Sequence, residues 1–112
     1  MHSRLILSLI VCAYAGGGTG IAGAQVASHY SKAHHGKLTA SGERFDMHAM
    51  TCAHRTAPFG TKFVISRGER SIVCRVNDRG PFTRGRHIDL SVAGALALGL
   101  NGVGRVTMVQ LR

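Results

Sequence analysis

Short runs that alternate apolar and polar residues, separated by glycine-containing turns, most constrain the fold of this chain. The clearest run covers 71–76, where Ile72, Cys74 and Val76 would share one face of a strand. Residues 67–70 have the pattern of a hairpin turn before it. Other runs have the same character, at 26–30, 62–66 and 105–111. Such short strands predict a small closed β-barrel, with an open β-sandwich fragment as the alternative.

Only short helical segments are expected among these strands. Ser91 is suited to be the N-cap of a helix over 92–98, which Gly99 would end. Residues 47–53 are predicted to form a short helical turn. The predicted class is therefore all-β with one or two short helices. The phenylalanines are expected to lie mainly in the core, namely Phe45, Phe59, Phe63 and Phe82.

Residues 1–24 have the pattern of a secretory signal peptide. A basic start is followed by an apolar segment over 5–15 and by small residues that end in an A-x-A cleavage pattern at Ala24. A cut after Ala15 is an alternative, although it would leave a short apolar segment. A membrane-spanning helix needs about 20 apolar residues, and the glycines over 16–20 argue against one. We therefore expect export to the periplasm or cell envelope without a stable membrane span.

The cysteines indicate a disulfide. Cys52 and Cys74 remain after the predicted cleavage, and an isolated pair in an oxidising compartment is expected to be bonded. A metal site formed by this pair with His54 is the alternative, but it lacks C-x-x-C spacing. We expect neither a metal ion nor a cofactor. Lipid attachment at Cys12 is a minor alternative, because bulky Val11 does not fit the small residue that such processing prefers.

The chain is strongly basic, with a formal net charge of +9 from 14 Lys and Arg against 5 Asp and Glu. Such a charge is common in nucleic-acid-binding proteins. Here the basic residues are dispersed, tryptophan is absent and other aromatic residues are few, which weakens a stacking platform for nucleic acid. An exported basic protein meets the anionic polymers of the cell envelope instead. We expect no nucleic-acid partner.

The few acidic residues are the best guide to the chemistry. Glu69 lies in the predicted hairpin turn, whereas the others occupy turn-rich segments, at Glu43, Asp46, Asp78 and Asp89. Asp78 ends a predicted strand at a Gly-Pro turn, where an aspartate ordinarily caps the turn and pairs with an arginine. Arg75 and Arg79 flank it, and it would be a poor acid if both paired with it.

Two kinds of chemistry fit these residue types. Cleavage of a glycosidic bond requires an acid for the leaving oxygen and a base for the attacking group. When the attacker is a hydroxyl group of the same sugar, no water site is needed, and one carboxyl group can serve first as acid and then as base. A Ser/His/Asp arrangement of Ser41, His54 and Asp78 is formally possible, but no nucleophile elbow accompanies it.

Five motifs, in order along the chain, carry a resemblance to a known family. They include Ala-Ser-His-Tyr at 27–30 and Arg-Val-Asn-Asp-Arg-Gly-Pro-Phe at 75–82, and the others cover 35–46, 53–61 and 85–91. Together they resemble the rare lipoprotein A family of bacterial cell-wall proteins. The resemblance implies a six-stranded double-psi β-barrel over residues 25–112, related to the expansins and barwin-like proteins.

One short internal echo suits the pseudo-twofold symmetry of that fold. Residues 57–60 are Ala-Pro-Phe-Gly, and residues 80–83 are Gly-Pro-Phe-Thr. The echo is too short to establish a repeat by itself.

The resemblance also implies an activity. It implies a lytic transglycosylase that cleaves peptidoglycan glycan strands to 1,6-anhydro-muramic products and prefers strands without stem peptides. The implied catalytic positions are Asp78, as the acid/base, with Glu43, Asp46 and His54. The implied sugar-contacting positions are Asn77, Arg79, Tyr30 and Thr39, while Asp89 is expected to support a loop. The alternatives are a non-catalytic, expansin-like module that binds or loosens wall glycan, and more distantly a barwin-type defence or inhibitor protein. We expect a monomer.

Overall fold

Six strands form the frame of the computed structural model, which describes residues 24–112. The predicted signal peptide, apart from Ala24, and Cys12 lie outside the described residues. The strands are β1 (Gln25–His29), β2 (Thr51–Ala53), β3 (Lys62–Arg67), β4 (Arg70–Asp78), β5 (Ile88–Leu90) and β6 (Gly104–Gln110). The helices are the 3-10 helix η1 (Lys32–His34) and α2 (Val92–Leu98). Among the described residues, no helix is long and apolar enough to cross a membrane.

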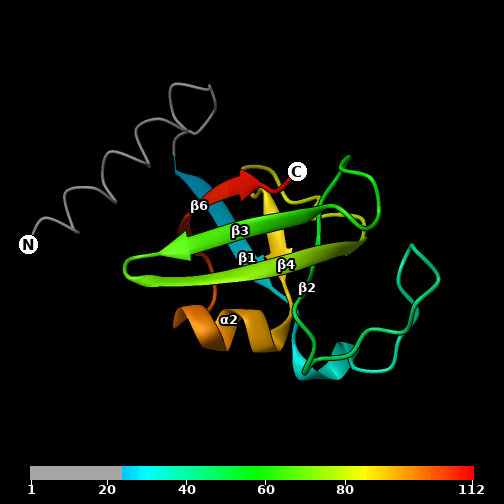
Figure 1. The fold of residues 1–112 in the computed structure, drawn as a ribbon. Helices are drawn as coiled ribbons and strands as arrows, with labels where there is room; N and C mark the ends of the chain where they lie inside the picture. Colours follow the sequence, from blue (N-terminus) through cyan, green and yellow to red (C-terminus); the bar gives the residue numbers. More distant parts are fainter. Residues whose placement is uncertain (1–23) are drawn as a thin grey trace, which may run out of the picture.

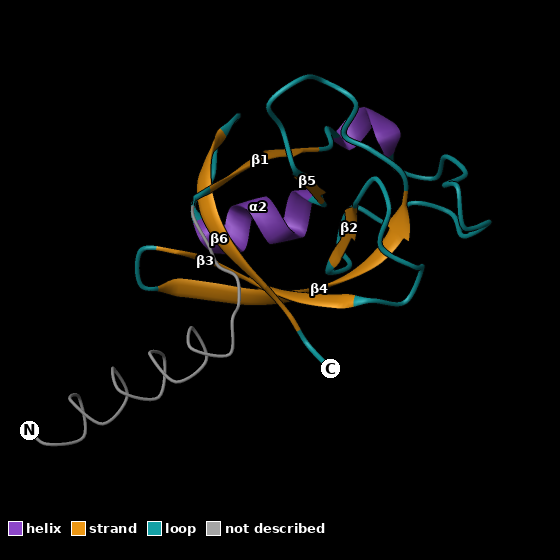
Figure 2. Ribbon diagram, turned by 90° about the horizontal axis from the view of Figure 1, so that it is seen from above, coloured by secondary structure: helices purple, strands orange, loops and turns teal. Residues whose placement is uncertain are grey.

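The strands close into a barrel in the order β1-β5-β2-β4-β3-β6, and β6 pairs with β1. The β1–β5 and β2–β4 pairs are parallel, and the other four pairs are antiparallel. Figure 2 shows the strands as a ring when the barrel is seen from above. Closure excludes the open β-sandwich alternative, and it removes the free sheet edges that an open sheet would expose.

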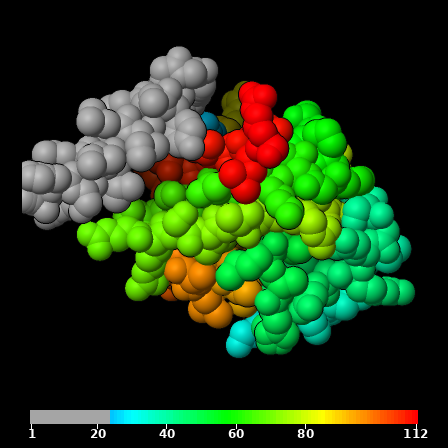
Figure 3. Space-filling view, viewed as in Figure 1, coloured from blue at the N-terminus to red at the C-terminus, as the bar shows by residue number. Residues whose placement is uncertain are grey.

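The predicted alternation in β4 positions the core. Ile72, Cys74 and Val76 are buried on one face, whereas Val73 between them is 45% exposed. The buried cluster draws one or more residues from every strand of the barrel. In the surface view, β3 and β4 form the near face, between β6 and α2 (Figure 3). The expected disulfide joins Cys52 to Cys74 inside this core and ties β2 to β4.

Helix α2 lies beside one open end of the barrel (Figures 1 and 2). The Oγ of Ser91 accepts a hydrogen bond from the backbone N–H of Gly94, as predicted for an N-cap. Gly99 ends the helix with a φ of 68°, a conformation that glycine adopts without steric cost. Arg67 from the β3–β4 hairpin donates to the carbonyl groups of Leu98 and Gly99, which helps to hold the helix end against the hairpin.

Two expectations about local structure are wrong. Residues 47–53 do not form a helical turn throughout, because Thr51–Ala53 is the strand β2, paired with β4 and β5. Phe59 and Phe82 do not lie in the core: they are 43% and 77% exposed, respectively. Phe45 and Phe63 are buried as expected. Strands β1 and β6 are each shifted by one residue toward the N-terminus from the predicted ranges, 26–30 and 105–111.

Candidate functional site

The carboxyl group of Asp78, the last residue of β4, is held from three sides. Its Oδ2 accepts a hydrogen bond of 2.5 Å from the hydroxyl group of Tyr30. Its Oδ1 accepts from the backbone N–H groups of Ala40, at 2.8 Å, and Arg79, at 2.9 Å. Figure 1 shows the loops that follow β1 and β2 on the side of the barrel where β4 finishes, at the right of the view. The carboxyl group is therefore fixed in position although it lies where the strand gives way to loops.

Tyr30 is itself held in place by an aromatic neighbour. Its ring stacks on Phe45 with 4.3 Å between the ring centroids, and Phe45 is 2% exposed. Burial raises the pKa of Tyr30 well above its usual value, and the hydrogen bond to Asp78 and the negative charge of that residue raise it further. The hydroxyl group therefore stays protonated and serves as a donor to Asp78.

The loop over 39–43 closes on itself and then docks on the end of β4. The hydroxyl group of Thr39 donates to the backbone carbonyl of Glu43 at 2.7 Å, and Thr39 is buried. The backbone N–H of Ser41 donates to the carbonyl of Asn77 at 3.2 Å. The amide of buried Asn77 donates in turn to Oε1 of Glu43 at 2.8 Å. The side chains of Thr39 and Asn77 are thus used within the protein, where they shape the loop.

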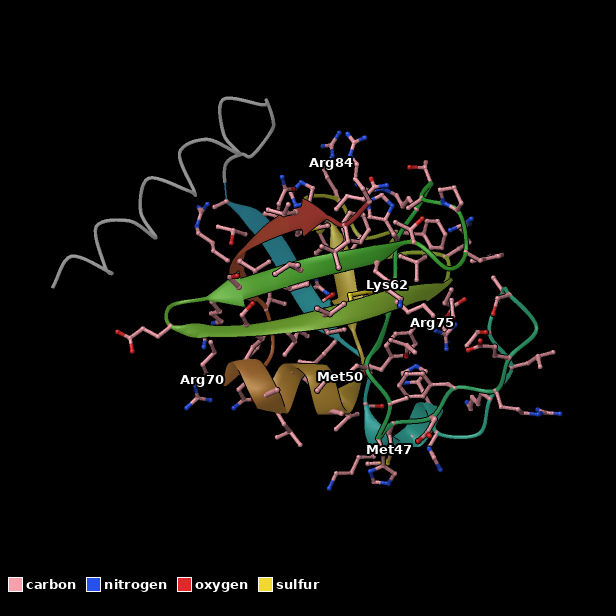
Figure 4. All side chains as sticks on the ribbon, viewed as in Figure 1. Met47, Met50, Lys62, Arg70, Arg75 and Arg84 are labelled. Carbon is pink, nitrogen blue, oxygen red and sulfur yellow. A yellow bond between two sulfur atoms is a disulfide. The ribbon has the colours of Figure 1, made fainter. Side chains whose placement is uncertain are left out.

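Arg75 pairs with Glu43 and not with Asp78. The two Arg75–Glu43 hydrogen bonds measure 2.8 and 3.2 Å, and Figure 4 shows Arg75 on the side of this loop. Hydrogen bonds from Arg75 and Asn77 lower the pKa of Glu43, so this carboxyl group is ionised at neutral pH. Glu43 is therefore an anchor for its neighbours and poorly suited to be a proton donor.

The guanidinium group of Arg79 also points away from Asp78. It donates to the backbone carbonyl groups of His54, at 3.0 Å, and Ala57, at 2.8 Å. Its Cζ atom lies 4.0 Å from the centroid of the Phe59 ring. With Arg75 bound to Glu43, neither flanking arginine uses its side chain to pair with Asp78, which removes the objection that the sequence raised.

His54 lies directly after β2, beside the end of β4. Its backbone N–H donates to the carbonyl of Asp78 at 3.2 Å, and its ring stacks on Phe63. The Nδ1 atom accepts hydrogen bonds from the backbone N–H groups of Thr56 and Ala57. An imidazole that accepts at Nδ1 carries its proton at Nε2, which leaves Nε2–H as the group able to donate to a ligand.

The ionisation of His54 makes a pH-dependent contribution to stability. Burial, and then the positive charges of Arg55 and Arg79, lower the pKa of His54 in the folded protein below its usual value of about 6.5. The unfolded chain therefore binds more protons as the pH falls through this range, so stability should decrease. We expect His54→Gln to lose less stability than the unmodified protein between about pH 7.5 and about pH 5.5. Urea unfolding at both pH values measures this, and equal losses in the two proteins would contradict it.

The two remaining candidate acids have local roles. Asp46 is exposed, and its Oδ1 accepts from the backbone N–H of His48, so it caps its own turn. Asp89 lies in β5, where it accepts a hydrogen bond of 3.0 Å from Ser28 in the neighbouring strand β1. Burial raises the pKa of Asp89, and the bond from Ser28 opposes this in part. This bond joins two strands, so Asp89 supports the barrel sheet and not a loop.

The structure argues against the two alternative sites that the sequence allowed. The hydroxyl group of Ser41 bonds to Thr39, and Nδ1 of His54 is occupied by backbone donors, so no Ser–His pair forms among the described residues. Cys52 and Cys74 are joined to each other and do not form a thiolate pair with His54. Residues 24–112 contain no group of three or more His, Cys, Asp or Glu placed to hold a metal ion.

Most of the predicted site residues belong to one connected network at the end of β4, namely Tyr30, Thr39, Glu43, His54, Asn77, Asp78 and Arg79. Asp46 has no hydrogen bond to this network among the described residues. The sequence reasoning did not identify the roles of the Ala40 N–H or of the Phe45 ring. Ala40 acts through its backbone, so no side-chain pattern could reveal it, whereas Phe45 precedes Asp46 in a motif already singled out.

The fold and this network define the class of the protein. A closed six-stranded barrel of mixed parallel and antiparallel pairs, with polar side chains gathered where β4 ends, is a double-psi β-barrel. The model of a family described as "Lytic transglycolase" matches residues 22–110. The chain belongs to this family.

Several curated proteins are similar to this barrel. A protein of Synechocystis named "Probable endolytic peptidoglycan transglycosylase RlpA" is 52% identical over 87 residues, which cover 74% of this chain and 27% of that protein. A protein of Nostoc with the same name is 58% identical over 71 residues, or 62% of this chain and 19% of that protein. The chain thus spans less than a third of the length of these relatives.

A solved structure has a similar fold. The Streptomyces papain inhibitor superposes with a TM-score of 0.62 at 24% identity, over 80% of this chain and 94% of that one. At this identity the likeness concerns the fold alone.

Proposed function

We propose that this chain is an exported lytic transglycosylase that cleaves the glycan strands of peptidoglycan, with Asp78 as its acid/base. The observation that carries the proposal is the position of Asp78: its carboxyl group is fixed at the barrel end, and both flanking arginines bind elsewhere. Membership of the lytic transglycolase family and the names of the relatives support the same reaction class.

In the proposed reaction, one carboxyl group transfers a proton twice. Asp78 gives a proton to the glycosidic oxygen as the bond between that oxygen and C1 of the muramic sugar breaks. The C6 hydroxyl group of the same sugar then attacks C1, and Asp78 takes up its proton. The new C1–O6 bond closes the 1,6-anhydro ring, and the carboxyl group regains its initial state. No water molecule enters the product.

The neighbouring groups have positioning roles in this proposal. Tyr30 and the N–H groups of Ala40 and Arg79 hold the carboxyl group of Asp78. The Nε2–H of His54 is a donor for a sugar hydroxyl group at the edge of the site. Glu43 is ionised by its partners and holds the 39–43 loop against β4, so we assign it a positioning role and not that of the acid.

The products of the reaction test the proposal. Purified protein incubated with peptide-free glycan strands should release fragments that end in anhydro-muramic acid, detected by mass spectrometry. Such ends have no aldehyde and resist borohydride reduction, whereas a hydrolase would create reducible ends. We expect slower release from strands that carry stem peptides. Binding of glycan without new ends of either kind would overturn the proposal in favour of a non-catalytic wall-binding module.

A further inference from the structure

Two loops at the barrel end hold each other through reciprocal arginines. Arg79, in the second loop, donates to the carbonyl groups of residues 54 and 57 in the first, at 3.0 and 2.8 Å. Arg55, in the first loop, donates to the carbonyl groups of Pro81, at 3.0 Å, and Arg86, at 2.9 Å. These are the loops that carry the Pro-Phe echo of the sequence. Their backbones are thus braced against each other, next to His54 and Asp78.

Each braced loop presents a phenylalanine ring to solvent. Phe82 is 77% exposed and Phe59 is 43% exposed, although phenylalanine is ordinarily among the most buried residue types. Phe59 lies against the guanidinium group of Arg79. The ring of Phe82 lies over Gly80, where an added Cβ atom would be 3.5 Å from the ring. The two rings therefore lie against the two residues that follow Asp78, Phe59 against the side chain of Arg79 and Phe82 against Gly80.

The two loops that carry these rings are rich in arginine, with Arg55 in the first and Arg79, Arg84 and Arg86 in the second. Arg84 projects from the loop of Phe82 at the edge of the barrel (Figure 4), and the guanidinium group of Arg55 binds the backbone carbonyl of Arg86 in that loop. Within residues 24–112, one ion pair joins an arginine to a carboxylate, that of Arg75 with Glu43, and Arg75 lies outside these two loops. No carboxylate in the described residues therefore forms an ion pair with an arginine of the two loops. An exposed ring on an arginine-rich loop fits an anionic polymer that also has an apolar face.

We propose that Phe82 is a stacking site for a pyranose ring of the glycan strand, next to the sugar that is cleaved at Asp78. The C–H groups on one face of a pyranose carry partial positive charge and pack on the negative face of an aromatic ring. Phe59 and Arg79 support the adjacent loop, and the positive charge of the arginines in the two loops attracts the carboxylates of muramic sugars. This inference rests on the proposed function, because it assumes that Asp78 acts on a glycan strand.

Binding measured without turnover tests the stacking site. Asp78→Asn protein should bind soluble peptide-free glycan strands in titration calorimetry, and adding Phe82→Ala should weaken that binding about tenfold. Phe82→Trp should keep the affinity within about twofold, because it retains an aromatic face. Leu96→Ala is the matched control, since Leu96 is 71% exposed on α2, away from the two loops, and should leave the affinity unchanged. The melting temperature should not change with Phe82→Ala, because the ring is mostly exposed.

The outcomes separate this inference from the proposed function. In the active protein, Phe82→Ala should raise KM about tenfold and leave kcat almost unchanged. Anhydro product with an unaltered KM in Phe82→Ala would overturn the stacking site and leave the function intact. Binding that depends on Phe82 without any anhydro product would overturn the function and leave Phe82 as a glycan contact that does not serve cleavage. Absence of glycan binding by the Asp78→Asn protein would overturn the stacking site directly.

Discussion

Asp78→Asn is expected to lower the release of anhydro-muramic product by roughly 10²- to 10⁴-fold, the range typical for loss of a general acid/base. Asparagine has almost the same shape, and its carbonyl oxygen can still accept from the backbone N–H groups of Ala40 and Arg79. It cannot give up and regain a proton at the glycosidic oxygen. The loss should therefore appear in kcat, with the melting temperature close to that of the unmodified protein.

Two further substitutions make this experiment specific. Glu43→Gln disrupts the ion pair with Arg75, but by our assignment it removes no proton donor, so product release should fall much less. Asp46→Asn changes an exposed residue that caps its own turn and should have the smallest effect. If Asp78→Asn released as much product as the unmodified protein, its role as acid/base would be wrong. If Glu43→Gln were the more damaging change, the acid would have to be reassigned.

The sequence predicts a strand well where one face of the strand is buried and the other is exposed to solvent. In β4, buried Ile72, Cys74 and Val76 alternate with exposed or partly exposed residues, which produces the period of two that identifies a strand. In β2, all three residues of Thr51–Ala53 are buried, so the segment has no alternation. Its pairing with β4 and β5 comes from tertiary structure. The prediction of a helical turn there failed for this reason.

At the candidate site, too, the sequence could not predict contacts that come from tertiary structure. The sequence placed Asp78 at a strand end but could not tell where its flanking arginines point. Arg79 binds carbonyl groups more than 20 positions away, and backbone carbonyls have no sequence signature. The prediction that Phe82 lies in the core was wrong for a related reason: hydrophobicity alone assigns it there, while a loop held by Arg55 keeps its ring in solvent. Residue type therefore marked Asp78 as a candidate acid, and tertiary hydrogen bonds decide what surrounds it.

Replacing both Cys52 and Cys74 by alanine is expected to destabilise the fold by about 3 kcal/mol through the loss of the closed loop in the unfolded chain. The two cysteines are 22 positions apart, both are fully buried, and they join β2 to β4. For a domain of this size, that loss corresponds to a melting temperature about 15 °C lower. Thermal unfolding followed by circular dichroism measures the change. The removal of two buried sulfur atoms adds to it.

A reducing agent separates the bond from the packing of the sulfur atoms. It should lower the melting temperature of the unmodified protein and have no effect on the double alanine variant. Alkylation of two thiols in the native, unreduced protein would show that the disulfide is absent. Because β2 has only three residues and leads directly into His54, loosening it should also displace that imidazole. The double alanine variant should therefore lose glycan cleavage at a lower temperature than the unmodified protein does. The temperature at which it loses activity should match its own melting temperature.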